Sequence, residues 1–315
     1  MSLAEGMREE IQTKQLLSVF ENLPKTQVSF IEPGGNFGDH LIWKGAYKAA
    51  RLAQVAYSAL SYEQLMQRSF GPEEVIYVHG GGGFVPWWSG KPMRMLAKLS
   101  AGFKGTLVLG PTTFLDDESY IREIFRQCFS EASFKRFFLF ARERTSFELV
   151  TRTKTLPRNA EIILEHDTAF NLRREDVLTE IVEPKGPVCY AIRHDKERPE
   201  GQGFNYLSWI DPIDISDTFE QWVRFHARSS ALVTNRTHST ILGTLLGIPT
   251  TMLPNGYHKN RSIWEHSLAA RGVEWRDSID CPQINRIIER DDFLRSVFTS
   301  RKYRKLLKIT QNWTG

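Results

Sequence analysis

The amino-acid sequence predicts an α/β protein of two domains, each with a parallel sheet. Its 315 residues exceed the usual size of a single domain. Short apolar runs alternate with helical patterns, which is typical of parallel strands joined by crossover helices. A polar, charged interval at 171–186 has the composition of a linker. We therefore expect an N-terminal α/β domain with glycine-rich loops over residues 1–183 and a C-terminal α/β domain over 184–315, whose last helix is a candidate to pack back on the first domain.

Apolar runs mark the strands expected in the first domain. They lie at 28–31, 75–78, 106–109, 137–140 and 162–164. Helical patterns follow at about 40–55, at 117–129 and from 146 onward. In the second domain, a strand is expected at 188–192 and an amphipathic helix at 215–228.

Two glycine-rich stretches follow expected strands. Gly34 to Asp39 joins a strand to a helix, an arrangement that brings backbone N–H groups close to an anion, although it is neither a GxGxxG nor a Walker sequence. Asp39 is a candidate site residue, with a helix N-cap as the structural alternative. Gly80 to Gly83 costs backbone entropy, so we expect close backbone approach or unusual dihedral angles there. The tryptophans at 87 and 88 could form a platform for a sugar ring or simply pack in the core.

A strand-to-helix crossing in the second domain carries Arg236 and His238. The strand is expected at 231–234 and the helix at 239–247, closed by a glycine. Such crossings lie at the carboxyl edge of parallel strands, where anionic ligands bind. Arg236 could bind a phosphate or carboxylate through a bidentate contact, and His238 could carry a proton near neutral pH. The structural alternative is an ion pair for the arginine and a helix cap for the histidine.

Arg142 follows the apolar run at 137–140 and so occupies the same kind of strand-end position as Arg236. The structural alternative for it is an ion pair with Glu143 or Glu148. Both arginines are therefore candidates to bind an anion, and both have a plainer interpretation.

Composition excludes several classes of function. A formal charge of +4 is too small to indicate a nucleic-acid partner and suits a small anionic ligand. Cys128, Cys189 and Cys281 are widely separated, without a CxxC pair or a histidine-rich cluster, so we expect reduced thiols and no metal. The sequence shows neither a signal-peptide pattern nor a run of ~18 apolar residues. A cytoplasmic location is expected.

Several short motifs together resemble the polysaccharide pyruvyl transferase family. In chain order they are Gly-Asn-Phe-Gly-Asp at 35–39, the glycine run at 80–83, Leu-Gly-Pro-Thr-Thr at 109–113, Arg142 to Ser146, His166-Asp167, Arg236-Thr237-His238 and Gly-Tyr-His-Lys-Asn at 256–260. Each motif alone is weak, but their order over most of the chain is specific. This family is similar to GT-B glycosyltransferases, so the resemblance implies two Rossmann-like domains facing a cleft.

The resemblance implies transfer of the pyruvyl group of phosphoenolpyruvate to a sugar of a bacterial exopolysaccharide, capsule or cell-wall glycan precursor, forming a ketal and releasing phosphate. It implies catalytic roles for His238 and Asp39 and donor binding by Arg236 and Arg142. The other substrate-binding residues it implies are Asn36, Gly81, Gly82, Thr112, His258, Lys259 and Asn260. This chain departs from the family pattern at Thr237, where leucine is usual, and at Thr112, where glutamine is common.

The residue types suit this chemistry. Phosphoenolpyruvate has a carboxylate and a phosphate, so Arg142 and Arg236 could hold its two ends. Protonation of the methylene carbon creates a cation-like centre, and His238 could supply that proton. Asp39 could accept the proton of the sugar hydroxyl or bind the acceptor. No cofactor is expected beyond the donor substrate.

Two other functions remain open at this point. A glycosyltransferase that uses a nucleotide sugar would share the two domains and the glycine loops. A catalytically silent glycan-binding module would keep the cleft, although the Arg236 and His238 pair argues against it.

The partners expected are the small-molecule donor and the glycan acceptor, without nucleic acid; a homo-oligomer is compatible with the sequence. The segment 301–308 is basic with interspersed leucines and could associate weakly with an anionic membrane face, while a solvated helix face is the plainer interpretation.

Overall fold

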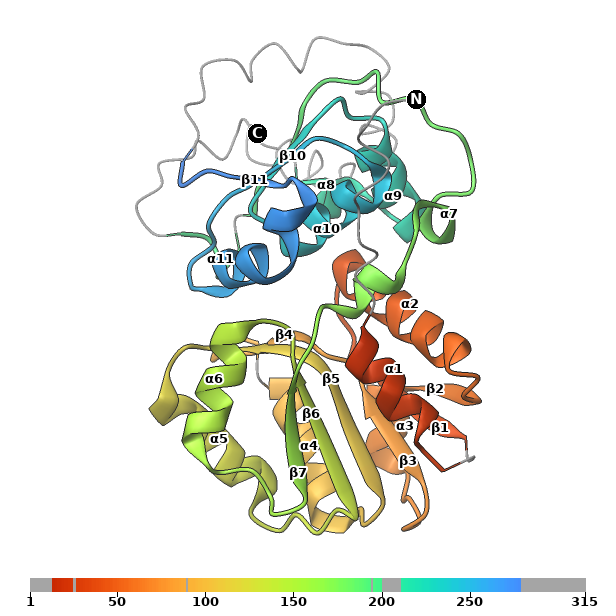
Figure 1. The fold of residues 1–315 in the computed structure, drawn as a ribbon, viewed down its shortest axis with the longest axis vertical. Helices are drawn as coiled ribbons and strands as arrows, with labels where there is room; N and C mark the ends of the chain where they lie inside the picture. Colours follow the sequence, from red (N-terminus) through yellow and green to blue (C-terminus); the bar gives the residue numbers. More distant parts are fainter. Residues whose placement is uncertain (1–12, 25–26, 89, 194, 200–210, 279–315) are drawn as a thin grey trace, which may run out of the picture. The chain divides into compact units, whose positions relative to one another are not determined.

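The computed structural model describes residues 13–24, 27–88, 90–193, 195–199 and 211–278 (Figure 1). The expected last helix, the basic segment 301–308 and Cys281 lie outside these residues. Cys128 and Cys189 are buried free thiols.

The chain divides into two compact units by its internal contacts. Of the described residues, unit 1 holds those up to Gly35, those from Asp39 to Leu172, and Arg261–Ser267. Unit 2 holds Asn36–Gly38, the described residues from Arg173 to Asn260, and those from Leu268 to residue 278. Two short segments thus belong to a different unit from the residues around them. The domain boundary expected at 183 and the cleft between facing domains stay predictions.

Unit 1 is built on a parallel sheet, which in the described residues has seven strands in the order β2-β1-β3-β5-β6-β7, with β4 paired to β5. The strands are β1 Val28–Glu32, β2 Tyr57–Ser61, β3 Val75–Val78, β4 Gly81–Phe84, β5 Thr106–Phe114, β6 Arg136–Ala141 and β7 Ala160–Leu164. All the strands expected from apolar runs in this unit are confirmed. Sequence patterns missed β2, a half-buried edge strand, and β4, whose glycines have low strand propensity.

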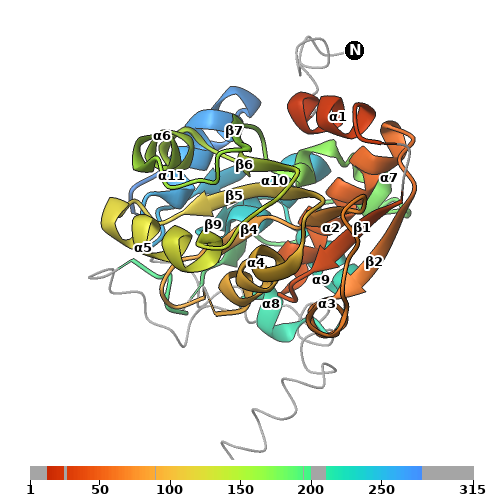
Figure 2. The same ribbon diagram turned by 90° about the horizontal axis from the view of Figure 1, so that it is seen from below.

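Helices cover both faces of this sheet. They are α1 Lys14–Glu21, α2 Phe37–Leu52, α3 Tyr62–Gln67, α4 Gly90–Gly102, α5 Glu118–Phe129, α6 Arg144–Thr153 and the 3₁₀ turn Thr168–Asn171. Successive residues of β5 point to opposite faces: Leu107 and Leu109 pack with α4 and α5, while Val108 packs with α1 and α2. Figure 2 shows α1 and α4 on opposite sides of the sheet. Burial on both faces explains why these strands read as continuous apolar runs.

Unit 2 contains a second parallel sheet, with the strand order β11-β10-β9-β8 among the described residues. The strands are β8 Cys189–Ala191, β9 Leu232–Thr234, β10 Thr250–Met252 and β11 Glu274–Trp275. The helices of this unit are α7 Arg174–Val177, α8 Pro212–Ile215, α9 Phe219–Ala227, α10 Thr237–Leu246 and the 3₁₀ turn Ala269–Arg271. Most residues of α11 Lys259–Ile263 and of the π-helix Trp264–Leu268 lie in the segment that belongs to unit 1. The α/β class with parallel sheets is therefore confirmed.

The helix expected at 215–228 is confirmed as α9, but it begins four residues later, at Phe219 after Thr218, because the short helix α8 ends at Ile215. The Thr218 hydroxyl accepts a hydrogen bond 3.1 Å from the Gln221 backbone nitrogen, which makes Thr218 an N-cap. By contrast, the glycine stop predicted for the helix after β9 is confirmed, because Gly247 closes α10 with φ +74°.

The segment Arg261–Ser267 returns the chain to unit 1. The Ser262 hydroxyl donates a hydrogen bond to Glu143 at 2.6 Å, and Ser267 Oγ lies 2.8 Å from Nδ1 of His166. The His166 and His266 rings stack with centroids 4.5 Å apart. The C-terminal half of the chain therefore contributes buried polar contacts to the first unit.

Candidate functional site

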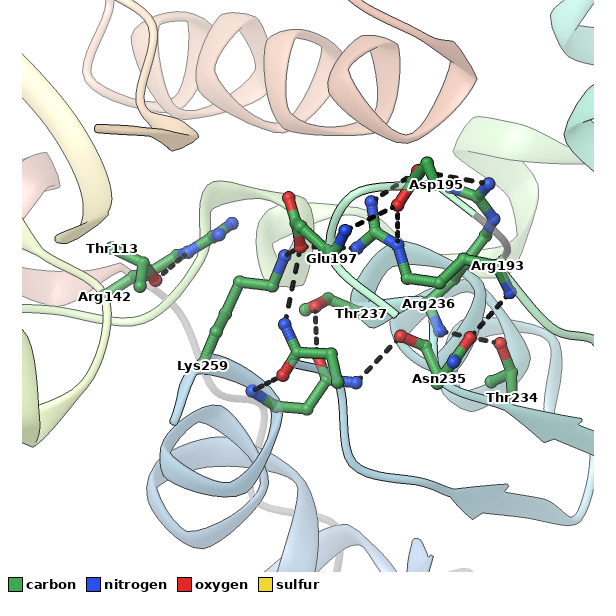
Figure 3. Close-up of polar contacts among 12 residues, drawn as sticks. Thr113, Arg142, Arg193, Asp195, Glu197, Thr234, Asn235, Arg236, Thr237 and Lys259 are labelled. Atoms are coloured by element: carbon green, nitrogen blue, oxygen red, sulfur yellow. Dashed lines mark hydrogen bonds and ion pairs between the residues drawn. The ribbon is translucent and has the colours of Figure 1, made fainter. Parts of the chain in front are cut away.

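Basic and acidic side chains gather at the carboxyl edge of the unit 2 sheet (Figure 3). Parallel pairing of β8 with β9 and of β9 with β10 brings the ends of these strands side by side. We call the group the unit 2 cluster: its basic members are Arg193, Arg236 and Lys259, and its acidic members are Asp195, Glu197 and Asp211. Such an edge is where parallel sheets bind anionic ligands.

Arg236 stands at the N-cap position of α10. Its backbone nitrogen donates to the Thr234 hydroxyl at 2.9 Å, and its Nε donates to a carboxylate oxygen of Asp211. Its Nη2 lies 3.7 Å from Asp195, and the side chain is 11% exposed. The arginine therefore takes part in ion pairs, as the structural alternative expected, but one of these is loose and partly open to solvent.

Arg193 forms the centre of the cluster. Its Nε and Nη2 donate to the two carboxylate oxygens of Asp195, each at 2.8 Å, and its Nη1 donates to Glu197 at 2.5 Å. Burial tends to raise the pKa of Asp195, but the hydrogen bonds and charge of Arg193 outweigh it and lower the pKa to about 2. Asp195 is therefore ionised at neutral pH and orders the arginine.

Lys259 is held by Glu197. Its ammonium group donates to Glu197, and its side chain is 6% exposed. Burial opposes ionisation of Glu197, yet the nearby Lys259 and Arg193 lower its pKa. The Lys259 nitrogen also lies 5.2 Å from the ring centroid of Tyr257, and the half-buried His258 ring lies 5.5 Å from that ring. Lys259 thus places a buried cation in the cluster.

Asp211 is the most buried acid of the cluster, and its side chain is fully inaccessible. Burial raises the pKa of Asp211, while the charge of Arg236 opposes that rise. The fixed contact with Nε sets the plane of the Arg236 guanidinium.

Asn260 connects the loops that follow β9 and β10. Its side chain donates to the backbone oxygens of Asn235 at 2.8 Å and Leu253 at 2.9 Å, and it accepts from the Thr237 hydroxyl at 2.8 Å. Asn260 is fully buried. The threonine that replaces the family's usual leucine at 237 therefore has a structural partner, and Asn260 supports the site from behind.

His238 lies in the first turn of α10 and is half-buried. Its imidazole packs directly against Gly38, beside which Asn36 is exposed. The structure therefore brings together Asn36 and His238, two candidate residues from distant parts of the sequence.

In unit 1, Arg142 is buried in an ion pair with Asp167. It is 1% exposed and donates at 2.8 Å to Asp167 through Nη1 and at 2.8 Å to the Thr113 hydroxyl through Nε. The predicted alternative partner Glu143 instead accepts a hydrogen bond from the Ser146 backbone nitrogen. The ion pair expected as the structural alternative is therefore present, but its partner is Asp167. Glu143 caps α6, and Glu148 lies 3.9 Å from Arg144 instead.

Thr112 points back to its own strand. Its hydroxyl donates to the Gly110 oxygen at 2.7 Å, and the residue is fully buried. Thr113, the next residue, contacts Arg142 instead.

The glycine run lies beside Asp39. Gly81 has φ +135°, and a Cβ atom placed on it would lie 3.7 Å from a carboxylate oxygen of Asp39. A Cβ on Gly80 would lie only 2.1 Å from the Pro111 oxygen, so the predicted close backbone approach is confirmed there. Gly82 is half-buried in β4.

Asp39 lies inside α2, which begins at Phe37. The N-cap interpretation of Asp39 is therefore wrong, because the helix begins within the Gly-Asn-Phe-Gly-Asp motif, three residues earlier than the apolar pattern suggests. Trp87 is half-buried and Trp88 is 43% exposed, so neither is fully buried in the core.

His79, which directly follows β3, is buried among aromatic side chains. It is surrounded by the rings of Phe30, Trp43, Tyr47 and Tyr77. Burial lowers the pKa of His79 to about 3, so the ring is neutral at physiological pH and cannot act there as a general acid.

Sequence patterns missed the acidic half of the unit 2 cluster. Arg193, Asp195 and Glu197 lie in a densely charged run directly after a strand, and that run was a usable signal. Asp211 had none, because its partner Arg236 is 25 residues away in the chain. The described part of the chain has no group of His, Cys, Asp or Glu side chains able to hold a metal ion. Nor does any helix in that part combine the length and apolarity needed to cross a membrane.

Comparison with known proteins agrees with the motifs. The model of the polysaccharide pyruvyl transferase family matches residues 36–257, which confirms the resemblance seen in the sequence. A functionally uncharacterised protein from Klebsiella pneumoniae subsp. pneumoniae NTUH-K2044 has a similar fold, with a TM-score of 0.59 and 18% identity over 84% of this chain and 96% of that one. Among curated proteins, no match is found.

Proposed function

The chain belongs to the polysaccharide pyruvyl transferase family, and from this premise we propose that it transfers the pyruvyl group of phosphoenolpyruvate to a sugar of a bacterial polysaccharide or cell-wall glycan precursor. The product is a pyruvate ketal, and phosphate is released. The observation that carries the proposal is the pairing of Arg236 with His238 at the start of α10, next to a cluster that holds further buried cations.

Arg236 is the proposed principal donor ligand. Its Nε is fixed by Asp211, whereas its Nη2, among the described residues, has the 3.7 Å contact with Asp195, whose side chain is 30% exposed. A phosphate or carboxylate can replace the loose contact, because Asp195 keeps its two hydrogen bonds to Arg193 and does not become an unpaired charge. The positive ends of the α10 peptide dipoles favour the same anion.

Other residues have secondary roles in this proposal. Lys259 adds a cation that offsets the negative charge of the donor. Arg142 is a second donor ligand, through the guanidinium N–H groups that do not take part in its pair with Asp167. Asn36, Gly81, Gly82 and His258 are proposed to contact substrate. Thr112 and Asn260 are proposed to act by shaping the backbone, since their side chains bond to nearby backbone oxygens.

The proposed reaction is balanced in protons and electrons. His238 donates a proton to the methylene carbon of phosphoenolpyruvate, and the adjacent carbon becomes cation-like. A sugar hydroxyl attacks that carbon and gives its proton to Asp39. The carbon–oxygen bond to phosphate then breaks, and the phosphate leaves with the proton that Asp39 accepted. A second hydroxyl of the sugar attacks the resulting cation, and its proton restores the histidine. No oxidant or reductant is needed.

The test is incubation of the full chain with phosphoenolpyruvate and a mixed pool of glycan precursors. We expect phosphate release that depends on the acceptor pool, and a product carrying a pyruvate ketal by mass spectrometry and NMR. Sugar nucleotides in place of phosphoenolpyruvate are the control. Glycosyl transfer from them, without ketal formation, would show a glycosyltransferase instead.

A further inference from the structure

The turn Asn36–Gly38 lies with unit 2, although Gly35 and Asp39 on either side lie with unit 1. Its own hydrogen bond shapes it, because the Asn36 side-chain oxygen accepts from the Gly38 backbone nitrogen at 2.8 Å. The Phe37 ring faces the fully buried Trp222 of α9, with centroids 6.4 Å apart. The turn therefore has a defined place on unit 2.

Gly38 touches the side chain of His238. A Cβ atom placed on Gly38 would lie 2.6 Å from Nδ1 and 2.8 Å from Cβ of His238, closer than real Cβ contacts. Because Cβ of the histidine is among the crowded atoms, rotating its ring about χ1 would not remove the overlap. Gly38 is not among the glycines with positive φ. Glycine is thus needed here for space and not for its dihedral freedom.

The first turn of α10 is held on its other side. Oγ of the buried Ser239 lies 3.0 Å from Nε2 of His226, and Nδ1 of that histidine lies 2.8 Å from the Trp222 oxygen. Burial lowers the pKa of His226 to about 4, so this ring is neutral at physiological pH. The Thr237 hydroxyl is bonded to Asn260. The helix therefore resists moving away from Gly38.

We propose that Gly38 is a positioning residue: because it has no side chain, its backbone packs directly against the His238 imidazole. This contact holds the ring in the orientation from which it donates its proton. This proposal rests on the proposed function of His238 as the acid. It explains why the first glycine inside α2 stands at this point, although alanine is the better helix former.

The test is Gly38→Ala, with Gly102→Ala as the matched control. Gly102 also lies in a helix, α4, and a Cβ atom there meets no other atom within 4 Å. In ¹H–¹⁵N spectra of the histidine side chains, the His238 peaks, identified by their loss in His238→Gln, should move in Gly38→Ala and stay in Gly102→Ala.

Turnover should fall by about 10²-fold in Gly38→Ala, the effect of a small misplacement of a reacting group. KM for phosphoenolpyruvate should change by less than about threefold, since an alanine at 38 leaves Arg236 in place.

Asn36→Ala is a second variant, useful if Gly38→Ala does not fold. It removes the oxygen that fixes the Gly38 nitrogen and should shift the same peaks with a drop in turnover of about tenfold, as expected for one lost hydrogen bond. Unmoved His238 peaks in the folded variants would show that Gly38 does not position the imidazole, whatever the turnover. Moved peaks with unchanged turnover would also overturn Gly38 as a positioning residue and would remove His238 from the chemistry. If the unaltered protein forms no ketal, the proposed function fails, and the peaks still decide the contact.

Discussion

Arg142 in unit 1 and Arg236 in unit 2 both follow the end of a parallel strand, yet their surroundings differ. Arg142 and its partner Asp167 are each 1% exposed, and Thr113 occupies another donor. Arg236 is 11% exposed and adjoins Asp195, which is 30% exposed and shared with Arg193. An arginine after a strand end thus lies in a fully buried ion pair in unit 1. In unit 2 it belongs to a partly exposed set of ion pairs with Asp195 and Arg193, which we call the open network.

The difference shows that the solvent exposure of an ion pair decides whether its arginine mainly stabilises the fold or can bind a ligand. A fully buried carboxylate cannot release its arginine to a ligand without remaining desolvated and unpaired, which is costly. A carboxylate at the solvent edge can release it, because water replaces the lost contact. We therefore infer that Arg142 contributes more to stability and Arg236 more to donor recognition.

The largest expected effect is that of replacing His238, which lies two residues after Arg236. His238→Gln should lower turnover by about 10²–10⁴-fold, because glutamine keeps hydrogen bonding but cannot donate a proton as imidazolium does. Donor affinity, measured by calorimetry with phosphoenolpyruvate, should stay nearly unchanged. A large loss of affinity with near-normal saturated turnover would show that the histidine only holds the donor. Asp39 would then be tested next.

Arg142→Ala should lower the free energy of unfolding by about 3–5 kcal/mol, because Asp167 is left buried and unpaired. Urea denaturation of the purified variant measures this. Arg122→Ala in the same unit is the control, since its pair with Glu118 has both side chains 42% exposed. If Arg142→Ala keeps wild-type stability and instead loses donor affinity, the comparison is reversed and the two-arginine grip of the donor gains support.

Arg236→Ala should weaken phosphoenolpyruvate binding by about 2–4 kcal/mol, as expected for loss of a charge-assisted bidentate contact. Arg236→Lys should also weaken it, since a point charge cannot reproduce the planar fork. Calorimetric titration measures both. The exposed Arg228 of the same unit supplies the control Arg228→Ala. Unchanged affinity in both Arg236 variants would exclude this arginine as the donor ligand.

The smallest expected effect is a pH dependence of the open network. The pKa of Asp195 is lowered to about 2 in the folded protein, so its contribution to stability is present above the pKa of the unfolded chain, about 4, and is lost as the pH falls toward 2. The contribution should be at most about 2 kcal/mol. Denaturation of wild-type protein and Asp195→Asn between about pH 6 and pH 2 tests it, and their difference in stability should shrink on acidification. A constant difference would mean that Asp195 does not stabilise the fold through its charge.

The sequence by itself determined the local and periodic features. Apolar runs located β1, β3, β5, β6 and β7 because a strand buried on both faces has no polar positions. Gly247 marked the end of α10 through its left-handed conformation, and the order of motifs identified the family before any contact was known. Arg236 and His238 were likewise selected from one short stretch, since a strand-to-helix crossing is a local event.

Only the tertiary structure decided which residues meet. Asp167 rather than Glu143 pairs with Arg142, Asp211 pairs with Arg236, and Gly38 touches His238. These partners come from separate strands, helices and loops, and the chain order constrains their meeting only weakly because many pairings cost similar loop-closure entropy. What selects among them is the packing of whole elements: the sheet register, the burial of α9 against α10, and the return of Arg261–Ser267 to unit 1. Burial in turn lowers the pKa of His79, a property that no local pattern of residues encodes.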